Sequence, residues 1–166
     1  MQEATVRAIV DGLKDAGIDF VVYMPDSFFF ETIGMLERDP AFECVSVPNE
    51  SVGMCLAAGA WLGGRKPVML MENTGLFVAM NAITRFHQPF GIPVLMLISY
   101  RGDAGDGFWM VTDIGRAFEP VLHDLGIAYE RVDEPERARK AIRLMQTSAS
   151  VSEELQAVVF RKEGAG

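Results

Sequence analysis

Polar side chains follow four apolar runs of the chain, at the points where β-strands would end. They lie at residues 25–27, 48–50, 72–75 and 100–103 and include carboxylates, hydroxyls, amides and a guanidinium. Carboxylates can take up and release protons in a reaction, and a guanidinium binds carboxylate, sulfonate or phosphonate groups. These residue types make the four groups candidates for acid–base chemistry and for binding an anionic ligand.

Alternating helices and strands would bring these groups together. Val6, Ile9, Val10 and Leu13 have helical spacing, and Gly17 ends that helix. Further helices are expected at 27–36, 49–62, 76–86, 116–125 and 135–145. Strands are expected at 20–24, 43–47, 68–71, 94–99, 128–132 and 156–161.

This order predicts an α/β fold, a doubly wound six-stranded parallel sheet with helices on both faces, because parallel neighbours need crossover connections. With 166 residues, 49% of them hydrophobic, the chain is expected to form a single domain over 1–166. Ligands of such sheets bind beyond the carboxyl ends of the strands, so the four polar groups should form one rim. Residues 101–112 are expected to form a long loop, which is typical of a functional or partner-facing segment.

Charge and hydropathy exclude several classes of partner. The chain has 23 acidic and 15 basic residues and a formal charge of −8, which disfavours binding to nucleic acid or an anionic membrane. Its longest uncharged apolar runs, 51–64 and 90–100, are shorter than the ~20 residues of a membrane span. We therefore expect a soluble, cytoplasmic protein. Cys44 and Cys55 have no metal or redox spacing and are expected to be buried free thiols.

Three common catalytic motifs are absent from the sequence. Lys66 precedes Pro67 instead of Ser or Thr, which excludes a phosphate-binding loop. Ser27 lacks the flanking glycines of a nucleophile elbow, and His87 and His123 lie away from the rim. No residues have zinc spacing, so no metal ligand is expected in this chain.

Two long segments carry a family resemblance. The runs VPNESVGMCLAAGAWLGGRKPVMLMENTGLFVAMNAIT (47–84) and FGIPVLMLISYRGD (90–103) resemble the pyrimidine-binding domain of thiamine diphosphate enzymes. Within that group they are most similar to sulfopyruvate decarboxylase alpha subunits and the matching half of phosphonopyruvate decarboxylases. The segments DFVVYMPDS (19–27) and IGRAFEPVLHDLGIAYERVD (114–133) extend the resemblance over nearly the whole chain.

The resemblance implies that Glu50 activates the cofactor. In these enzymes a glutamate at this position hydrogen-bonds the pyrimidine N1′ atom and promotes deprotonation of the thiazolium C2. The step requires a partly desolvated carboxyl group, in which a charge-assisted hydrogen bond is strong. The alternative is that Glu50 only stabilises the first turn of a helix.

The resemblance also implies roles for the neighbouring loops. Asp26 and Ser27 match a region that carries a catalytic acid in related decarboxylases, although either residue could be only a helix N-cap. Pro25 lies in the same cofactor-binding loop. Asn73, Thr74 and Gly75 match a loop beside the thiazolium, with Thr74 also near the substrate, although Asn73 could be a plain turn residue.

Tyr100 and Arg101 are the expected substrate-binding residues after the fourth strand. The Arg101 guanidinium could bind the acid group of a substrate, pair with Asp103, or contact a partner chain. Tyr100 stands where related enzymes carry a His or Trp, so a proton relay would have to come from another residue.

Aromatic and apolar residues replace polar ones that the related decarboxylases carry. The replacements are at Phe77 and Val78, at Phe28 to Phe30, and at Phe108 to Val111. Burial of a sulfonate without donors costs several kcal/mol, which favours a less polar 2-oxo acid or an aldehyde acceptor. The alternative is that these side chains pack in the core or against a partner subunit.

The resemblance implies a cofactor shared with a second protein. Gly105, Asp106 and Gly107 resemble the start of a diphosphate–magnesium motif, but the last asparagine of the chain is Asn81, so the motif is incomplete. Thiamine diphosphate and Mg²⁺ would therefore be bound with a separate diphosphate-binding beta subunit, in a hetero-oligomer whose pyrimidine domains also pair. The implied reaction is decarboxylation of a small 2-oxo acid. The alternatives are carboligation with the same cofactor, or a non-catalytic interaction subunit.

Overall fold

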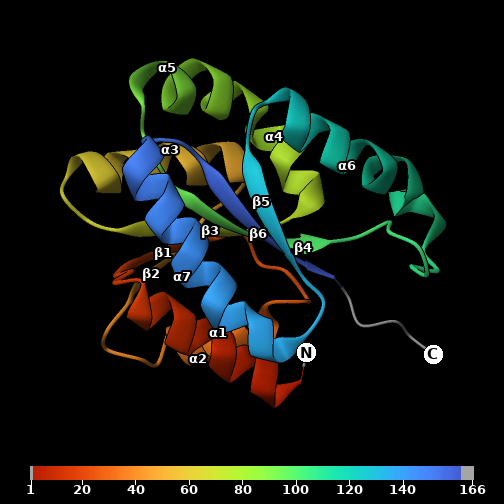
Figure 1. The fold of residues 1–166 in the computed structure, drawn as a ribbon, viewed down its shortest axis with the longest axis horizontal. Helices are drawn as coiled ribbons and strands as arrows, with labels where there is room; N and C mark the ends of the chain where they lie inside the picture. Colours follow the sequence, from red (N-terminus) through yellow and green to blue (C-terminus); the bar gives the residue numbers. More distant parts are fainter. Residues whose placement is uncertain (1, 162–166) are drawn as a thin grey trace.

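The computed structural model describes residues 2–161 and contains one parallel sheet between two layers of helices (Figure 1). The strands are β1 (Phe20–Tyr23), β2 (Glu43–Ser46), β3 (Pro67–Glu72), β4 (Leu95–Tyr100), β5 (Ala128–Val132) and β6 (Gln156–Arg161). They pair in the order β2-β1-β3-β4-β6-β5, and every pair is parallel. The predicted α/β fold class is confirmed.

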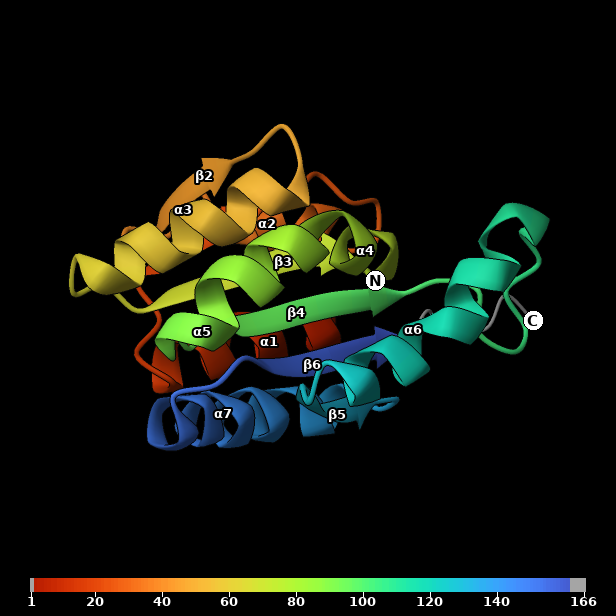
Figure 2. The ribbon, with the colours of Figure 1, turned by 90° about the horizontal axis from the view of Figure 1, so that it is seen from above.

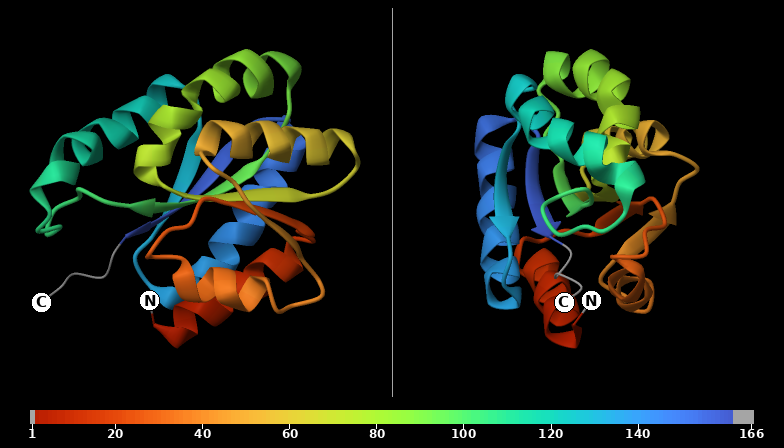
Figure 3. Two further views of the ribbon diagram at one scale, coloured as in Figure 1. Left: turned by 180° about the vertical axis from the view of Figure 1, so that it is seen from behind. Right: turned by 90° about the vertical axis from the view of Figure 1, so that its right-hand side faces the viewer.

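The helices connect consecutive strands. The longer helices are α1 (Glu3–Asp15), α2 (Phe30–Leu36), α3 (Glu50–Leu62), α4 (Asn73–Ala82), α6 (Thr112–Asp124) and α7 (Pro135–Ser152). After α4 the chain continues as a π-helix (Ile83–His87) and then α5 (Gln88–Phe90), and a short 3₁₀ turn (Trp109–Val111) precedes α6. In Figure 3 the helices lie on both sides of the sheet.

Several element boundaries differ from those predicted. The helix expected from residue 27 begins at Phe30, and the helix expected from residue 76 begins at Asn73. The helix expected from residue 116 begins at Thr112, which shortens the predicted loop, and α7 continues to Ser152. The sequence gives weak signals at the starts of α2, α4 and α6, because no side chain caps the N-terminus of these three helices.

Two hydrophobic clusters hold the layers on the sheet. Alternate strand residues such as Leu70, Leu97 and Phe160 pack under α1, α2 and α7. The residues between them, such as Met71 and Ile98, pack under α3, α4 and α6. This alternation follows from the period of two along a strand, and it determines which strand-end side chain faces which helical layer.

The direction of the connections changes between β1 and β3. Helix α2 leads from β1 outward to β2 on one face, whereas α4 leads from β3 to β4 on the other face. The loops at the carboxyl ends of β1 and β3 therefore diverge and leave a crevice, the usual ligand position in open α/β sheets. Figure 2 shows that the segment between β4 and α6 projects beyond this edge.

Candidate active site

A hollow of about 250 Å³ lies at the crevice between the ends of β1 and β3. It is open to solvent and contains three carboxyl groups from three different segments of the chain. Its lining residues are Met24, Pro25, Asp26, Ser27, Glu50, Glu72 and Thr74. Five of the predicted site residues, Pro25, Asp26, Ser27, Glu50 and Thr74, are thus brought together.

Glu50 is the first residue of α3 and reaches across to the start of α4. The Asn49 side chain caps α3 by accepting a hydrogen bond from the Val52 backbone N–H at 3.0 Å, which fixes the helix start. The Glu50 side chain lies so close to Gly75 that a Cβ atom there would be 2.5 Å from Glu50 Cγ and 2.6 Å from Oε1. Gly75 therefore gives Glu50 its path into the hollow.

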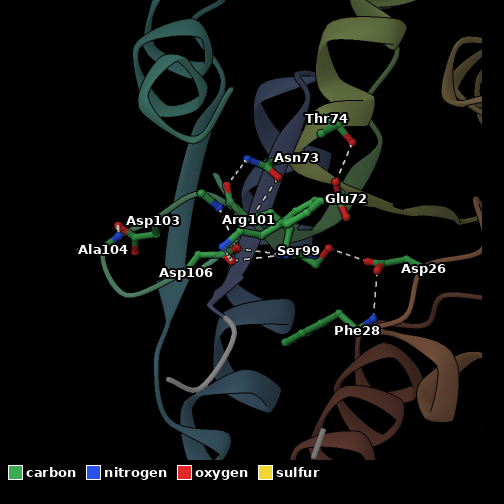
Figure 4. A network of polar contacts seen from close by, with 12 residues as sticks. Asp26, Phe28, Glu72, Asn73, Thr74, Ser99, Arg101, Asp103, Ala104 and Asp106 are labelled. Carbon is green, nitrogen blue, oxygen red and sulfur yellow. Dashed lines mark hydrogen bonds and ion pairs between the residues drawn. The ribbon is translucent and has the colours of Figure 1, made fainter. Parts of the chain in front are cut away.

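Asp26 is held at both carboxylate oxygens. Its Oδ1 accepts a hydrogen bond from the Phe28 backbone N–H at 2.9 Å, and its Oδ2 accepts one from the Ser99 hydroxyl at 2.5 Å (Figure 4). Asp26 thus stabilises the turn before α2, although the α2 N-cap position belongs to Phe29. Ser99 lies on β4 and was missed by the sequence analysis. Its signal was a small polar residue that follows four apolar residues in the strand.

Asn73 joins the ends of β3 and β4. Its amide donates to the Arg101 carbonyl at 2.9 Å, and its side-chain oxygen accepts from the Arg101 backbone N–H at 3.0 Å. Asn73 is fully buried and begins α4, so it is not a simple turn residue. Beside it, the Thr74 hydroxyl donates to a Glu72 carboxylate oxygen at 3.0 Å, which directs both polar groups toward the hollow.

The Arg101 guanidinium is paired with Asp106. Its Nε lies 2.7 Å from Asp106 Oδ2, and that oxygen also accepts the Gly102 backbone N–H at 3.0 Å. The hydrogen bond from Arg101 holds the pKa of Asp106 well below its usual range. The same bond raises the pKa of Arg101, and the negative charges of Glu72 and Asp26 add to the effect.

Asp103, the pairing partner considered for Arg101, is instead bound by Arg131 and Arg161. The negative charges of the hollow therefore act on Arg101, but its guanidinium group is already hydrogen-bonded to Asp106.

Tyr100 faces away from the hollow. Its ring packs on Phe118, and its hydroxyl donates to the Gly115 carbonyl at 2.9 Å, within the helical layer formed by α3, α4 and α6. Strand alternation explains this position, because Tyr100 follows Ser99 and must point to the opposite face. The described structure does not bring Tyr100 to the other predicted site residues.

The aromatic residues that distinguish this chain divide into two groups. Phe28 and Phe29 pack on Phe160, with ring centroids 6.3 and 5.8 Å away, so they support the Asp26 loop from below. Phe30 and the projecting residues Phe108, Trp109 and Met110 are exposed.

The histidines and cysteines lie outside the hollow. His87 is buried between two backbone carbonyls, with Nδ1 3.0 Å from Ile92 O and Nε2 2.9 Å from Met54 O, while His123 is exposed. The prediction of buried thiols is wrong for Cys55, which is exposed, and Cys44 is half-buried. Cys55 lies on the outer surface of α3, a position that an apolar helix with a weak amphipathic pattern does not reveal.

The described residues include no group of three or more His, Cys, Asp or Glu side chains arranged to hold a metal ion. No helix among residues 2–161 is long and apolar enough to span a membrane.

Residues 4–117 match the family described as thiamine pyrophosphate enzyme, N-terminal TPP binding domain. The chain belongs to this family. The thiamine pyrophosphate enzyme domain is also 34% identical over 142 residues to a protein of Methanothermobacter thermautotrophicus named sulfopyruvate decarboxylase subunit alpha. That match covers 86% of this chain and 86% of the relative.

Two further proteins resemble this thiamine pyrophosphate enzyme domain. A phosphonopyruvate decarboxylase of Streptomyces viridochromogenes is 33% identical over 98 residues, which cover 59% of this chain and 25% of that protein. The structure of 2-oxoglutarate:ferredoxin oxidoreductase from Magnetococcus marinus aligns with a TM-score of 0.74 over 97% of this chain and 29% of that chain. Its sequence identity is 13%, so this likeness supports the fold alone.

Proposed function

We propose that this chain is the alpha, pyrimidine-binding subunit of a thiamine diphosphate-dependent decarboxylase of 2-oxo acids, of the sulfopyruvate decarboxylase type. The observation that carries the proposal is the Glu50 carboxyl group at the hollow, in a chain that matches sulfopyruvate decarboxylase alpha subunits over most of its length. The name of that relative, subunit alpha, supports an enzyme with a partner subunit.

The residues of the hollow fit half of the cofactor. Gly75 leaves the space that Glu50 occupies, and the hollow is open to solvent. A hollow of about 250 Å³ is smaller than the roughly 300 to 1,000 Å³ of pockets that enclose a whole small molecule. This size supports a half-site for the aminopyrimidine, with the remainder bound elsewhere. Thiamine diphosphate, when bound, supplies the carbon nucleophile and accepts the electrons released as carbon dioxide leaves.

The chain's own residues would hold and move protons around that ring. Glu50 would hydrogen-bond the pyrimidine N1′ atom, and the short reach allowed by Gly75 would keep that contact in place. Asp26, fixed at both oxygens, would present its carboxylate at the opposite side of the hollow. Pro25 and Ser27 would form the wall beside it, and Thr74 would border the cofactor and substrate.

A diphosphate-binding partner subunit would complete the site and bring Mg²⁺. The chain aligns with a quarter of the phosphonopyruvate decarboxylase but with most of the sulfopyruvate decarboxylase alpha subunit. The segment between β4 and α6 projects beyond the edge that carries the hollow (Figure 2). Its residues Phe108, Trp109 and Met110 are exposed, and large exposed apolar side chains mark protein interfaces. The partner would cover them and supply cations for an anionic substrate, since Asp106 occupies Arg101.

The test is carbon dioxide release by the complex that is co-purified through a tag on this chain, with added Mg²⁺ and thiamine diphosphate. Sulfopyruvate, phosphonopyruvate, pyruvate and branched 2-oxo acids are the substrates. We expect turnover of at least one acid, and a loss of at least about 100-fold in Glu50→Gln, the size of a removed acid–base step. Glu136→Gln, which changes a carboxyl group in the first turn of α7, is the matched control and should keep full activity.

The products discriminate between the reactions. A free aldehyde supports decarboxylation, whereas a coupled ketol would replace that proposal with carboligation. A stable complex that binds the cofactor but turns over no acid would contradict both enzyme functions and favour an interaction subunit.

A further inference from the structure

We propose that Ser99 is a positioning residue that aims the Asp26 carboxylate into the site. This inference rests on the proposed function, because Asp26 acts there on the bound substrate or cofactor. Ser99 itself does not line the hollow. It acts through its hydrogen bond to Asp26 Oδ2, at 2.5 Å.

The position of Ser99 on β4 directs its hydroxyl toward Asp26. Leu95, Leu97 and Ser99 alternate along β4, and the two leucines pack in the cluster under α1, α2 and α7. Ser99 continues that row, between Glu72 on β3 and Phe160 on β6. It is 1% exposed, so water cannot take over the role of its partner. A buried hydroxyl requires a hydrogen bond, and Asp26 provides the acceptor.

The two hydrogen-bond donors to Asp26 belong to different parts of the fold. The Phe28 N–H belongs to the same loop as Asp26 and moves with it. Ser99 belongs to the central part of the sheet, between β3 and β6, so its hydrogen bond ties the loop to a rigid element. Without Ser99 the carboxylate could rotate about its own side chain while the turn stayed intact. Figure 4 shows the side chains of Ser99 and Asp26 pointing toward each other.

The arrangement predicts a specific loss when the hydroxyl is removed. A hydrogen bond to a charged group is worth roughly a 10- to 100-fold change in equilibrium, so Ser99→Ala should lower kcat by about that factor. The loss should fall on kcat and leave KM nearly unchanged, because Asp26 would act during the reaction and not in initial binding. Ser99→Thr retains the hydroxyl and should restore most of the activity, while Ser99→Cys keeps the volume with a weaker donor and should not.

The experiment measures kcat and KM for these variants in the co-purified complex, beside Asp26→Asn and the double variant Asp26→Asn/Ser99→Ala. In the Asp26→Asn background, Ser99→Ala should cost less than twofold, because the group that it positions is already changed. Thr5→Val removes another buried hydroxyl, on α1 and outside the lining of the hollow, and is the matched control that should keep wild-type kcat.

Four results would overturn the inference. Wild-type kcat in Ser99→Ala would show that the hydrogen bond is dispensable. Equal losses in Ser99→Ala and Ser99→Thr, or full additivity with Asp26→Asn, would show a packing effect. A wild-type complex that turns over no 2-oxo acid would overturn the proposed function as well, which is a different result from an active wild type with an unaffected Ser99 variant.

Discussion

The side chain of Glu50 occupies the space where a Cβ atom on Gly75 would lie. Gly75→Ala should therefore displace Glu50 and lower turnover by at least about 10-fold, since a 1 Å misplacement in a reacting geometry can cost about 100-fold. The measurements are turnover and the Kd of thiamine diphosphate for the complex. The control is Gly59→Ala, which lies on the same helix as Glu50 and where an added Cβ atom would meet nothing within 4 Å. If both variants behave alike, the close approach has no functional role.

The pair Arg101–Asp106 should make the loop after β4 sensitive to acid. Arg101 lowers the pKa of Asp106, so the folded state binds fewer protons than the unfolded chain when the pH falls below about 4. The stabilisation is therefore complete above that pH and is lost progressively as the pH falls toward the lowered pKa. In Asp106→Asn, the free energy of unfolding should drop by about 1 to 3 kcal/mol at pH 7, and its decrease below pH 4 should be smaller. The measurement is urea unfolding at several pH values. If the free energy of unfolding of Asp106→Asn fell with pH below 4 as steeply as that of the wild type, the assignment would be contradicted.

Protonation of His87 should destabilise the fold. Burial lowers the pKa of His87 below its usual value near 6.5, although the carbonyl oxygens of Ile92 and Met54 favour the charged ring. The unfolded chain then binds a proton that the folded chain does not, so stability falls as the pH drops below about 6.5 and is unaffected above it. We expect stability to fall between pH 7.5 and 5.5, by at most about 1.4 kcal/mol for each pH unit. His87→Gln should reduce that difference, and His123→Gln, at an exposed position, is the matched variant.

The two thiols should react at very different rates. Burial, and to a lesser degree the charge of Glu37, raises the pKa of Cys44 to about 11, whereas Cys55 is exposed on α3. Because the thiolate is the reactive form, a maleimide at pH 7.5 should modify one thiol of the native chain quickly and the second only after unfolding. Mass spectrometry of Cys55→Ser should show no fast modification. Rapid labelling of Cys44 in that variant would contradict the burial argument.

Much of the fold could be predicted from the sequence because its strands and helices have strong, regular apolar patterns. The parallel sheet and all six strands follow from them, and so does the gathering of Asp26, Glu50 and Thr74 at one edge. The residues that depend on tertiary contacts could not be predicted. No local pattern pairs Ser99 with Asp26 across 73 positions, or selects Asp106 over Asp103 for Arg101.

The placement of Tyr100 could have been predicted, because a regular rule was available. Strand alternation places it opposite Ser99, yet the resemblance to enzymes with a ring residue at that position favoured a role at the site. The α-helix expected over 76–86 ends earlier, because residues Ile83–His87 form a π-helix. In this segment the His87 ring lies between the backbone carbonyls of Met54 and Ile92, which no local sequence pattern indicates.

The segment that follows β4 turns back so tightly that Gly102 and Gly115 meet backbone to backbone. A Cβ atom on Gly102, which has φ +81°, would overlap the Val111 carbonyl, and one on Gly115 would overlap the Gly102 backbone. A substitution at one glycine cannot be relieved by a side-chain change at the other, because each clash involves main-chain atoms. A side chain at either glycine would therefore displace the main chain at the base of this segment, whereas the exposed tip around Trp109 has room for other side chains.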